Sequence, residues 1–274
     1  MKKINLGLIG LGYIGKVHLR NCLRLKSANL TAVCDISKKA LKYAREMGVK
    51  KTYTDYTELL KDKMVDAVII SLPTFLHQRC VEESAESRKD IFLEKPMARN
   101  EIEGKKILKS TRKYGVKLMI GYPLRFVTEF LNLKEEMENG LLGDVQAAHA
   151  VLVGSGPFIH RSEKDVPKPV PEWWFKKELT GGGALIDAGC HIINLLRWYF
   201  GEITDVKSIL SYRFNLDVED FAMCLMKFKS GTISCMEVGW FSQRDLLKIE
   251  MHGTVRHAYA RRKAPSKVVA AIQQ

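Results

Sequence analysis

Five short apolar runs, each bounded by turn residues, alternate with helix-like segments through the first half of the chain. They are INLGLI (4–9), LTAVC (30–34), AVIISL (67–72), IFLE (91–94) and KLMIGY (117–122). Strands that alternate with helices form parallel sheets, and near-continuous apolar strands are typical of sheets covered by helices on both faces. Ser37 and Gly48 flank one intervening segment as ordinary helix start and stop signals. The first half therefore predicts a doubly wound parallel sheet.

The second half has a different order of elements. Residues 127–140, VTEFLNLKEEMENG, predict a helix that ends at Gly140. The strand-like runs are VQAAHAVLV (145–153), VKSILSYRF (206–214), FAMCLMKF (221–228), TISCMEVGW (232–240) and LLKIEMHG (246–253). Runs separated by turn or charged residues predict a mostly antiparallel open sheet, here with helices on one side. We expect an α/β domain over residues 1–122 and an α+β domain over residues 123–274.

The net charge of +13 raises the question of a nucleic-acid partner. Basic residues are mixed with acidic ones along the predicted helices, and no basic stripe with stacking aromatic residues is found, so no nucleic-acid partner is predicted. The exception to this mixing is the end of the chain, residues 255–274, which has five Lys or Arg and no acid. Such a surplus can help attract phosphorylated or acidic ligands.

The cellular location is inferred from apolar runs and cysteines. No apolar run reaches the length of about 18 residues that a membrane span needs, and the start of the chain does not match a secretion signal. Six cysteines are scattered without a CxxC pair, which is typical of reduced thiols in a cytosol. We therefore expect a cytoplasmic protein without a membrane partner.

A glycine-rich turn, GLGYIG (10–15), follows the first strand and opens the first helix. Asp35 closes the second strand, where its carboxylate can accept hydrogen bonds from a ribose diol. The predicted dinucleotide contacts are Gly10, Gly12, Tyr13, Ile14, Gly15 and Asp35. Because a carboxylate repels a 2′-phosphate, NAD is favoured. NADP stays possible because Lys38 and Lys39 are near.

An acid and an imidazole interrupt an otherwise apolar helix-like stretch, GGGALIDAGCHIINLLRW (181–198). Asp187 and His191 are four residues apart, so a helix would make them neighbours on one face. A charged group in such a setting costs several kcal/mol unless it is paired. Two interpretations stay open at this point, a buried Asp–His bond that fixes the helix and a chemical site.

The order and spacing of further motifs resemble a known family. These motifs are SLPTFLH (71–77), LEKPMA (93–98) and GYPLRF (121–126), together with the glycine-rich turn and the DxGxH segment. From about residue 4 to about residue 253 the chain is similar to the Gfo/Idh/MocA family of glucose-fructose oxidoreductase and inositol 2-dehydrogenase. The resemblance implies a Rossmann domain and a substrate-binding and oligomerisation domain. It also implies a homodimer or homotetramer formed through the second sheet.

The activity implied by the resemblance is hydride transfer between NAD(P) and a secondary alcohol or ketone of a sugar, cyclitol or related polyol. The implied catalytic residues are Lys95, Asp187 and His191. Imidazole suits proton exchange near neutral pH, so His191 is the expected general base, with Asp187 orienting it and Lys95 stabilising alkoxide charge. A surface ion pair is the alternative role for Lys95.

Further contacts are expected from the residue types and their places at strand ends and in the long loop. The additional cofactor contacts expected are Ser71, Pro73, Thr74, His77, Glu94 and Lys95. The expected substrate contacts are Lys95, Arg125, Trp173, Trp174, Asp187 and His191. A place on a helix surface stays open for Arg125, and capping the core stays open for either tryptophan. For His77, a contact with the nicotinamide ribose and a structural place at a helix start are equally open. Gly181 to Gly183 are expected to let the backbone pass close to cofactor or substrate.

Two departures and two alternative functions complete the sequence interpretation. Pro123 stands where the family often has Asn or His. After His252 the chain continues as a basic tail without strand alternation, so an incomplete sheet edge is expected. The alternatives are a non-catalytic dinucleotide-binding sensor, or truncated inactive homologue, and an NAD-assisted glycoside hydrolase. No metal is predicted, because neither His77 with Cys80 nor Cys190 with His191 has two further ligands nearby.

Overall fold

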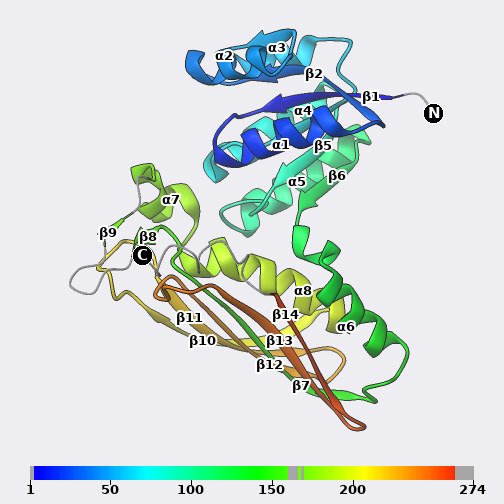
Figure 1. Cartoon of the computed structure of the whole chain (residues 1–274), viewed down its shortest axis with the longest axis vertical. Coiled ribbons are helices and arrows are strands. Elements are labelled where there is room, and N and C mark those ends of the chain that lie inside the picture. Colours follow the sequence, from blue (N-terminus) through cyan, green and yellow to red (C-terminus); the bar gives the residue numbers. More distant parts are fainter. Residues whose placement is uncertain (1–2, 160–165, 168–169, 263–274) are drawn as a thin grey trace, which may run out of the picture. The chain divides into compact units, whose positions relative to one another are not determined.

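The computed structural model describes residues 3–159, 166–167 and 170–262, and the chain divides into two compact units, Met1–Gly121 and Tyr122–Gln274 (Figure 1). Within its described residues, the first unit forms one parallel sheet of six strands in the order β3-β2-β1-β4-β5-β6. The strands are β1 (Ile4–Ile9), β2 (Ala28–Cys34), β3 (Lys51–Tyr53), β4 (Ala67–Ile70), β5 (Asp90–Glu94) and β6 (Leu118–Gly121). This order is typical of dinucleotide-binding sheets.

Helices cover both faces of this sheet, as the apolar strands predict. They are α1 (Tyr13–Arg24), α2 (Lys38–Glu46), α3 (Tyr56–Lys61), α4 (His77–Glu86) and α5 (Glu101–Tyr114). Leu8 faces one core, with α1 and α2, while its neighbour Ile9 faces the other, with α3, α4 and α5. Ser37 accepts a hydrogen bond from the N–H of Ala40 and so caps α2, as predicted.

All five predicted strands of the first half are confirmed, whereas β3 was not predicted. It has only three residues, Lys51 to Tyr53, and lies at the sheet edge. A strand this short has too few positions to show an apolar run or an alternation.

The described part of the second unit has a sheet in the order β10-β11-β12-β7-β13-β14. Its strands are β7 (Val145–Val153), β10 (Ile203–Ser211), β11 (Phe221–Phe228), β12 (Ile233–Gly239), β13 (Leu246–Gly253) and β14 (His257–Arg262). Neighbours are antiparallel except β12 and β7, which run parallel. A small separate pair is formed by β8 (Phe158–Ile159) and β9 (Val166–Pro167).

The expectation of a tail without strands after His252 was wrong for residues 257–262. These residues form β14, which pairs with β13 from Leu247 to His252. Its sequence, HAYARR, hides the strand because Ala260 is the one buried residue among exposed or half-exposed ones. An edge strand with charged residues is a common protection against unwanted pairing. Residues 263–274 lie outside the described residues.

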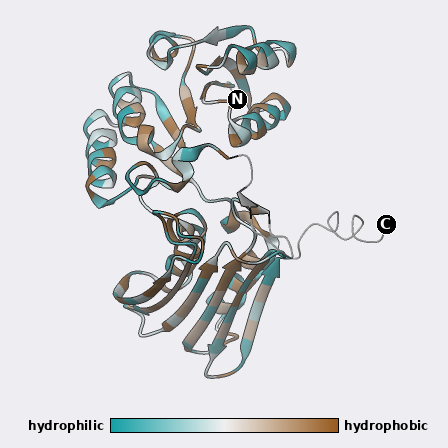
Figure 2. Ribbon diagram, turned by 90° about the vertical axis from the view of Figure 1, so that its left-hand side faces the viewer, coloured by the Kyte–Doolittle hydropathy of each residue, from teal (hydrophilic) through white to brown (hydrophobic). Residues whose placement is uncertain are grey.

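One face of this sheet is covered by α6 (Thr128–Glu138) and α8 (Cys190–Phe200). The fully buried side chains in this core include Phe130, Ile192, Leu195, Met236 and Ile249. Figure 2 shows the hydrophobic colour concentrated on α8 and the strands beneath it. By length and composition alone, Lys177–Phe200 is apolar enough to cross a membrane, but its second half is part of this core. The opposite face of the sheet exposes Ile209, Leu225 and Ile233.

Candidate functional site

The three glycines of the turn between β1 and α1 have different surroundings. Gly10 has φ +93°, and a Cβ there would lie 2.6 Å from the carbonyl oxygen of Ser71. A Cβ on Gly15 would lie 2.1 Å from the carbonyl oxygen of Gly10. A Cβ on Gly12 would meet nothing within 4 Å. The fold therefore requires Gly10 and Gly15, whereas Gly12 leaves space that a ligand can occupy.

This turn has the donor set that a pyrophosphate requires. Gly12 stands at the N-cap position of α1 and brings no capping side chain. The first N–H groups of a helix lack partners within the helix, and they carry the positive end of its dipole. Backbone N–H groups beside an open glycine therefore fit the phosphates of a dinucleotide.

Asp35 fixes the turn to the end of β2. The N–H of Leu11 donates to its Oδ2 at 2.6 Å, and the N–H of Ser37 donates to its Oδ1 at 2.7 Å. A carboxylate has about four acceptor positions, so capacity for a ribose diol is left. The next residue, Ile36, is 91% exposed and gives the neighbourhood an apolar side chain.

Glu94 links the end of β5 to α1. Its Oε1 lies 2.6 Å from Nε2 of His18, and its Oε2 accepts the N–H of Lys95 at 3.2 Å. The His18 ring also packs edge-on against Phe92 at 5.4 Å. The peptide bond between Lys95 and Pro96 is cis. Glu94 therefore holds the backbone from which Lys95 projects, a role that the sequence did not predict.

The surroundings of His77 favour the structural place, one of the two alternatives that the sequence left open. Its side chain is buried, with Nδ1 2.9 Å from the carbonyl oxygen of Pro96 and Nε2 2.9 Å from that of Leu72. Burial lowers the pKa of this imidazole, and the two carbonyl groups oppose that shift. Because both nitrogens face backbone carbonyls, the ring joins the loops after β4 and β5.

The other predicted residues after β4 hold the same loops together. The hydroxyl of Ser71 donates to the carbonyl oxygen of Gly10 at 2.8 Å. Pro73 precedes the short helix η1 (Thr74–Leu76), and Thr74 is buried. These residues shape the carboxyl edge of the sheet, where ligands of such sheets bind.

In the second unit, Asp187 and His191 lie on one continuous helical segment. The sequence predicted an α-helix there, but Leu185–Gly189 forms a π-helical turn (η4) before α8 begins at Cys190. Such single turns occur frequently at functional sites. Both side chains are partly exposed, and the ring of Tyr122 packs edge-on against His191 at 6.0 Å. Burial raises the pKa of Tyr122.

Arg125 lies in the short helix η2 (Pro123–Phe126) and is bound to α8. Its Nε donates to Oδ1 of Asn194 at 2.7 Å, and its guanidinium lies 5.5 Å from the ring centre of Trp198. These contacts make Arg125 a support for the helix that carries His191. A direct substrate contact is therefore not needed to explain its place.

Trp173 and Trp174 lie in η3 (Glu172–Phe175), which precedes α7 (Lys177–Thr180). Their ring centres are 5.9 Å apart, and both side chains are half-buried. The long loop predicted around them, 154–180, is described except for residues 160–165 and 168–169. Both indoles keep exposed area with which they could contact a substrate.

Within the glycine run, Gly183 has a structural requirement of its own. A Cβ on Gly183 would lie 1.9 Å from the carbonyl oxygen of Glu219. The N–H of Ala184 donates to that same oxygen at 2.8 Å. Gly183 is therefore required because two segments of the second unit approach each other closely.

Gly183→Ala is expected to lower the free energy of unfolding by about 2–4 kcal/mol, because the added methyl must push the backbone of Glu219 away. Urea denaturation followed by circular dichroism measures the change. Gly104→Ala is the control, since its Cβ would make only an ordinary contact of 3.6 Å with Met97. Equal stability of both variants would contradict the packing described for Gly183.

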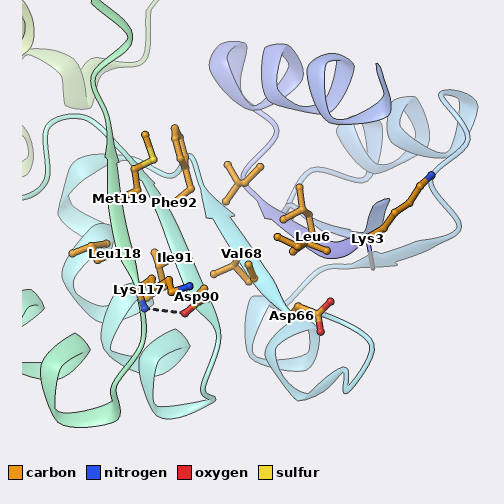
Figure 3. A pocket seen from close by; sticks show the side chains of 13 residues that line it. Lys3, Leu6, Asp66, Val68, Asp90, Ile91, Phe92, Lys117, Leu118 and Met119 are labelled. Atoms are coloured by element: carbon orange, nitrogen blue, oxygen red, sulfur yellow. Dashed lines mark hydrogen bonds between the residues drawn. The ribbon is translucent and has the colours of Figure 1, made fainter. Parts of the chain in front are cut away.

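A hollow of about 530 Å³ lies in the first unit away from the glycine-rich turn (Figure 3). Asp66, Asp90 and Lys117, at the amino ends of β4, β5 and β6, line it together with Leu6 and Phe92. The turn and Glu94 are at the carboxyl ends of their strands, so this hollow is not the cofactor site. Among the residues that the structure describes, no three His, Cys, Asp or Glu side chains are grouped to hold a metal ion.

Comparison with protein families agrees with these features. Residues 4–122 match the model of an oxidoreductase family with an NAD-binding Rossmann fold. Residues 130–257 match the model of the Gfo/Idh/MocA C-terminal domain. The chain belongs to the Gfo/Idh/MocA oxidoreductase family. The predictions of an oxidoreductase, of an NAD cofactor and of this fold are thereby confirmed.

Individual relatives support the assignment. The chain is 30% identical over 279 residues to the uncharacterized oxidoreductase YrbE of Bacillus subtilis, covering 97% of this chain and 76% of the relative. It is 30% identical over 241 residues to myo-inositol 2-dehydrogenase of Thermotoga maritima, covering 85% and 68%. The crystal structure of a probable dehydrogenase from Thermotoga maritima has a TM-score of 0.85 at 27% identity, covering 95% and 76%.

In this Gfo/Idh/MocA protein, sequence reasoning missed three residues beside the predicted ones. They are His18, Tyr122 and Glu219, which contact Glu94, His191 and the start of the helix that carries Asp187. None has a local signal, because each acts on a residue far along the chain or across a turn. Sequence motifs therefore identify candidate reactive residues more easily than the residues that hold them in place.

Proposed function

We propose that this protein transfers hydride between NAD and a ring-borne secondary alcohol of a sugar or cyclitol. The observation that carries the proposal is the pair Asp187 and His191 on one helix of a chain that belongs to an NAD-dependent oxidoreductase family. The substrate class is supported by the similarity to an enzyme named myo-inositol 2-dehydrogenase.

The proposed chemistry divides one oxidation between a hydride and a proton. Bound NAD supplies the acceptor for the hydride that leaves the carbinol carbon. His191 takes the hydroxyl proton with the electron pair of its unprotonated ring nitrogen, and the C–O bond becomes a carbonyl. Asp187 stabilises the resulting imidazolium. Lys95 donates a hydrogen bond to the same oxygen and favours its developing negative charge.

The cofactor is proposed to lie on the turn and loops of the first unit. The N–H groups at the start of α1 would hold the pyrophosphate beside Gly12, and Asp35 would accept the hydroxyls of the adenosine ribose. Ile36 offers no charge to a 2′-phosphate, which favours NAD. Of the remaining predicted contacts, Ser71, Pro73, Thr74 and Glu94 shape the loops around the nicotinamide.

Asp35→Ala is expected to weaken the binding of NAD at least about tenfold and the binding of NADP less. The carboxylate accepts the ribose hydroxyls of NAD, whereas it repels the 2′-phosphate that NADP carries on the same ribose. Fluorescence titrations give the two Kd values, and their ratio cancels any loss of affinity that affects NAD and NADP equally. Asp55→Ala is a matched control, since Asp55 likewise accepts an N–H two residues ahead, from Thr57, but at the start of α3. An unchanged ratio in Asp35→Ala would contradict the proposed contact between Asp35 and the ribose.

Assembly is proposed to use the open face of the second sheet. Ile209, Leu225 and Ile233 are 75%, 53% and 52% exposed on that face. Apolar side chains grouped on one surface favour contact with another subunit. Light scattering of the purified protein would measure the proposed dimer or tetramer. A cytoplasmic location also stays a prediction.

A panel of inositols and monosaccharides, each incubated with NAD and with NADP, tests the function. Formation of NADH or NADPH, followed by absorbance, and of an oxidised sugar, followed by mass spectrometry, is expected. Cofactor binding without turnover of any substrate would favour the sensor alternative. Release of a sugar from a glycoside without net NADH would favour the hydrolase alternative.

A further inference from the structure

Glu219 accepts hydrogen bonds from the first three backbone N–H groups of the helical segment that leads to Asp187. It lies in the connection between β10 and β11 and is only 6% exposed. Its Oε1 accepts the N–H of Gly183 and the N–H of Leu185, each at 2.9 Å. Its carbonyl oxygen accepts the intervening N–H, that of Ala184, at 2.8 Å. One residue thus satisfies three successive backbone donors.

These donors belong to a helix start that has no local cap. The first N–H groups of a helix have no partner within it, and a nearby Ser, Thr, Asp or Asn usually serves them. Here the cap lies 36 residues further along the chain. A carboxylate also suits the positive end of the helix dipole, and hydrogen bonds to an ionised acceptor are stronger than neutral ones.

The cap is itself tied to the sheet. The N–H of Asp220 donates to the carbonyl oxygen of Ser211, and the N–H of Trp240 donates to the carbonyl oxygen of Asp220. Strand β11 begins at Phe221, directly after the pair of acids. A helix start held this way takes its position from the sheet. Within the helix, the N–H of Asp187 donates to the carbonyl oxygen of Gly183 at 2.9 Å.

We propose that Glu219 is a positioning residue for the reaction. It fixes the start of the π-helical turn against the sheet and so sets where Asp187 and His191 are presented to the substrate. It touches neither substrate nor cofactor. This inference rests on the proposed function, because it assumes that Asp187 and His191 carry the chemistry. A displacement of catalytic groups by about 1 Å can lower the rate about 100-fold, so loss of the cap is expected to have a large effect on turnover.

Three variants separate positioning from general stability. Glu219→Ala removes the side-chain acceptor, whereas Glu219→Gln keeps an oxygen at the same reach. Asp220→Ala is the matched control, since Asp220 is equally buried but accepts the N–H of Phe214 at 2.7 Å rather than any helix donor. If Glu219→Ala does not fold, Glu219→Asp replaces it, because the shorter side chain cannot reach both donors.

We expect kcat per folded molecule to fall at least about tenfold in Glu219→Ala and to stay within about threefold of wild type in Glu219→Gln and Asp220→Ala. The Kd for NADH should be unchanged in all three. In hydrogen exchange followed by mass spectrometry, a peptide spanning 181–189 should exchange at least about tenfold faster in Glu219→Ala than in wild type or Asp220→Ala.

The inference is overturned if Glu219→Ala loses stability but its folded fraction turns over at the wild-type rate, or if Glu219→Gln is as slow as Glu219→Ala. Unchanged exchange in the 181–189 peptide of Glu219→Ala would overturn it as well. If wild-type protein oxidises no polyol, the proposed function fails, and the exchange measurement still decides whether Glu219 holds the helix start.

Discussion

His191→Ala and Lys95→Ala are each expected to lower the turnover of a polyol substrate at least about 100-fold, while the Kd for NADH stays within about threefold of wild type. His191 is proposed to remove the hydroxyl proton, and without a base that proton must leave to water. Lys95 is proposed to stabilise the alkoxide that forms at the same oxygen. Both contributions are made in the transition state, so kcat falls more than substrate affinity.

Stopped-flow measurement of NADH formation with saturating NAD gives the rate, and fluorescence titration gives the Kd. Lys105→Ala is the control for loss of a positive charge, because Lys105 is exposed and pairs with Glu101 on α5. Wild-type turnover in both His191→Ala and Lys95→Ala would remove the proposed mechanism. A loss in one variant alone would assign the proton transfer to that residue.

Gly12→Ala is expected to raise the Kd for NAD at least about tenfold while lowering the free energy of unfolding by no more than about 1 kcal/mol. Gly12 has φ −61° and ψ −163°, an extended backbone outside the left-handed region that favours glycine, and its Cβ would meet no protein atom within 4 Å. The new methyl therefore clashes with no protein atom, and the remaining cost is that alanine is a poorer N-cap residue than glycine. It occupies the space in which the backbone is expected to approach the pyrophosphate.

Isothermal titration with NAD and urea denaturation measure the two quantities in parallel. Gly15→Ala is the contrasting variant, because its Cβ would lie 2.1 Å from the carbonyl oxygen of Gly10 and must destabilise the fold itself. NAD affinity equal to wild type in a folded Gly12→Ala protein would place the pyrophosphate elsewhere. A loss of stability in Gly12→Ala as large as that in Gly15→Ala would contradict the open space described at this turn.

Much of the first unit follows from local pattern. Leu8 and Ile9 are both apolar because successive side chains of a strand face opposite cores, and both cores are covered by helices. The sequence could not show β3 or β14 in the same way. Lys51 to Tyr53 are too few, and His257 to Arg262 bury one side chain, so neither has a readable period.

The candidate site divides along the same line. Gly10, Gly12, Gly15 and Asp35 were predicted from spacing, and the structure shows that Asp35 also holds Leu11 and Ser37. The place of His77 after a strand end left a cofactor contact and a structural role equally open, and both its nitrogens face backbone carbonyls. Its two partners, Leu72 and Pro96, are on different loops, and only packing brings them to one ring.

By itself the sequence determined the two kinds of sheet, the glycine-rich turn and the types of chemical group, because each depends on neighbours within a few residues. The tertiary structure alone decided which groups are supports. His18 meets Glu94 across 76 positions, and Glu219 meets Gly183 across 36. Such pairs form only when whole elements pack, since burial selects partners by their place in space and not by their distance along the chain.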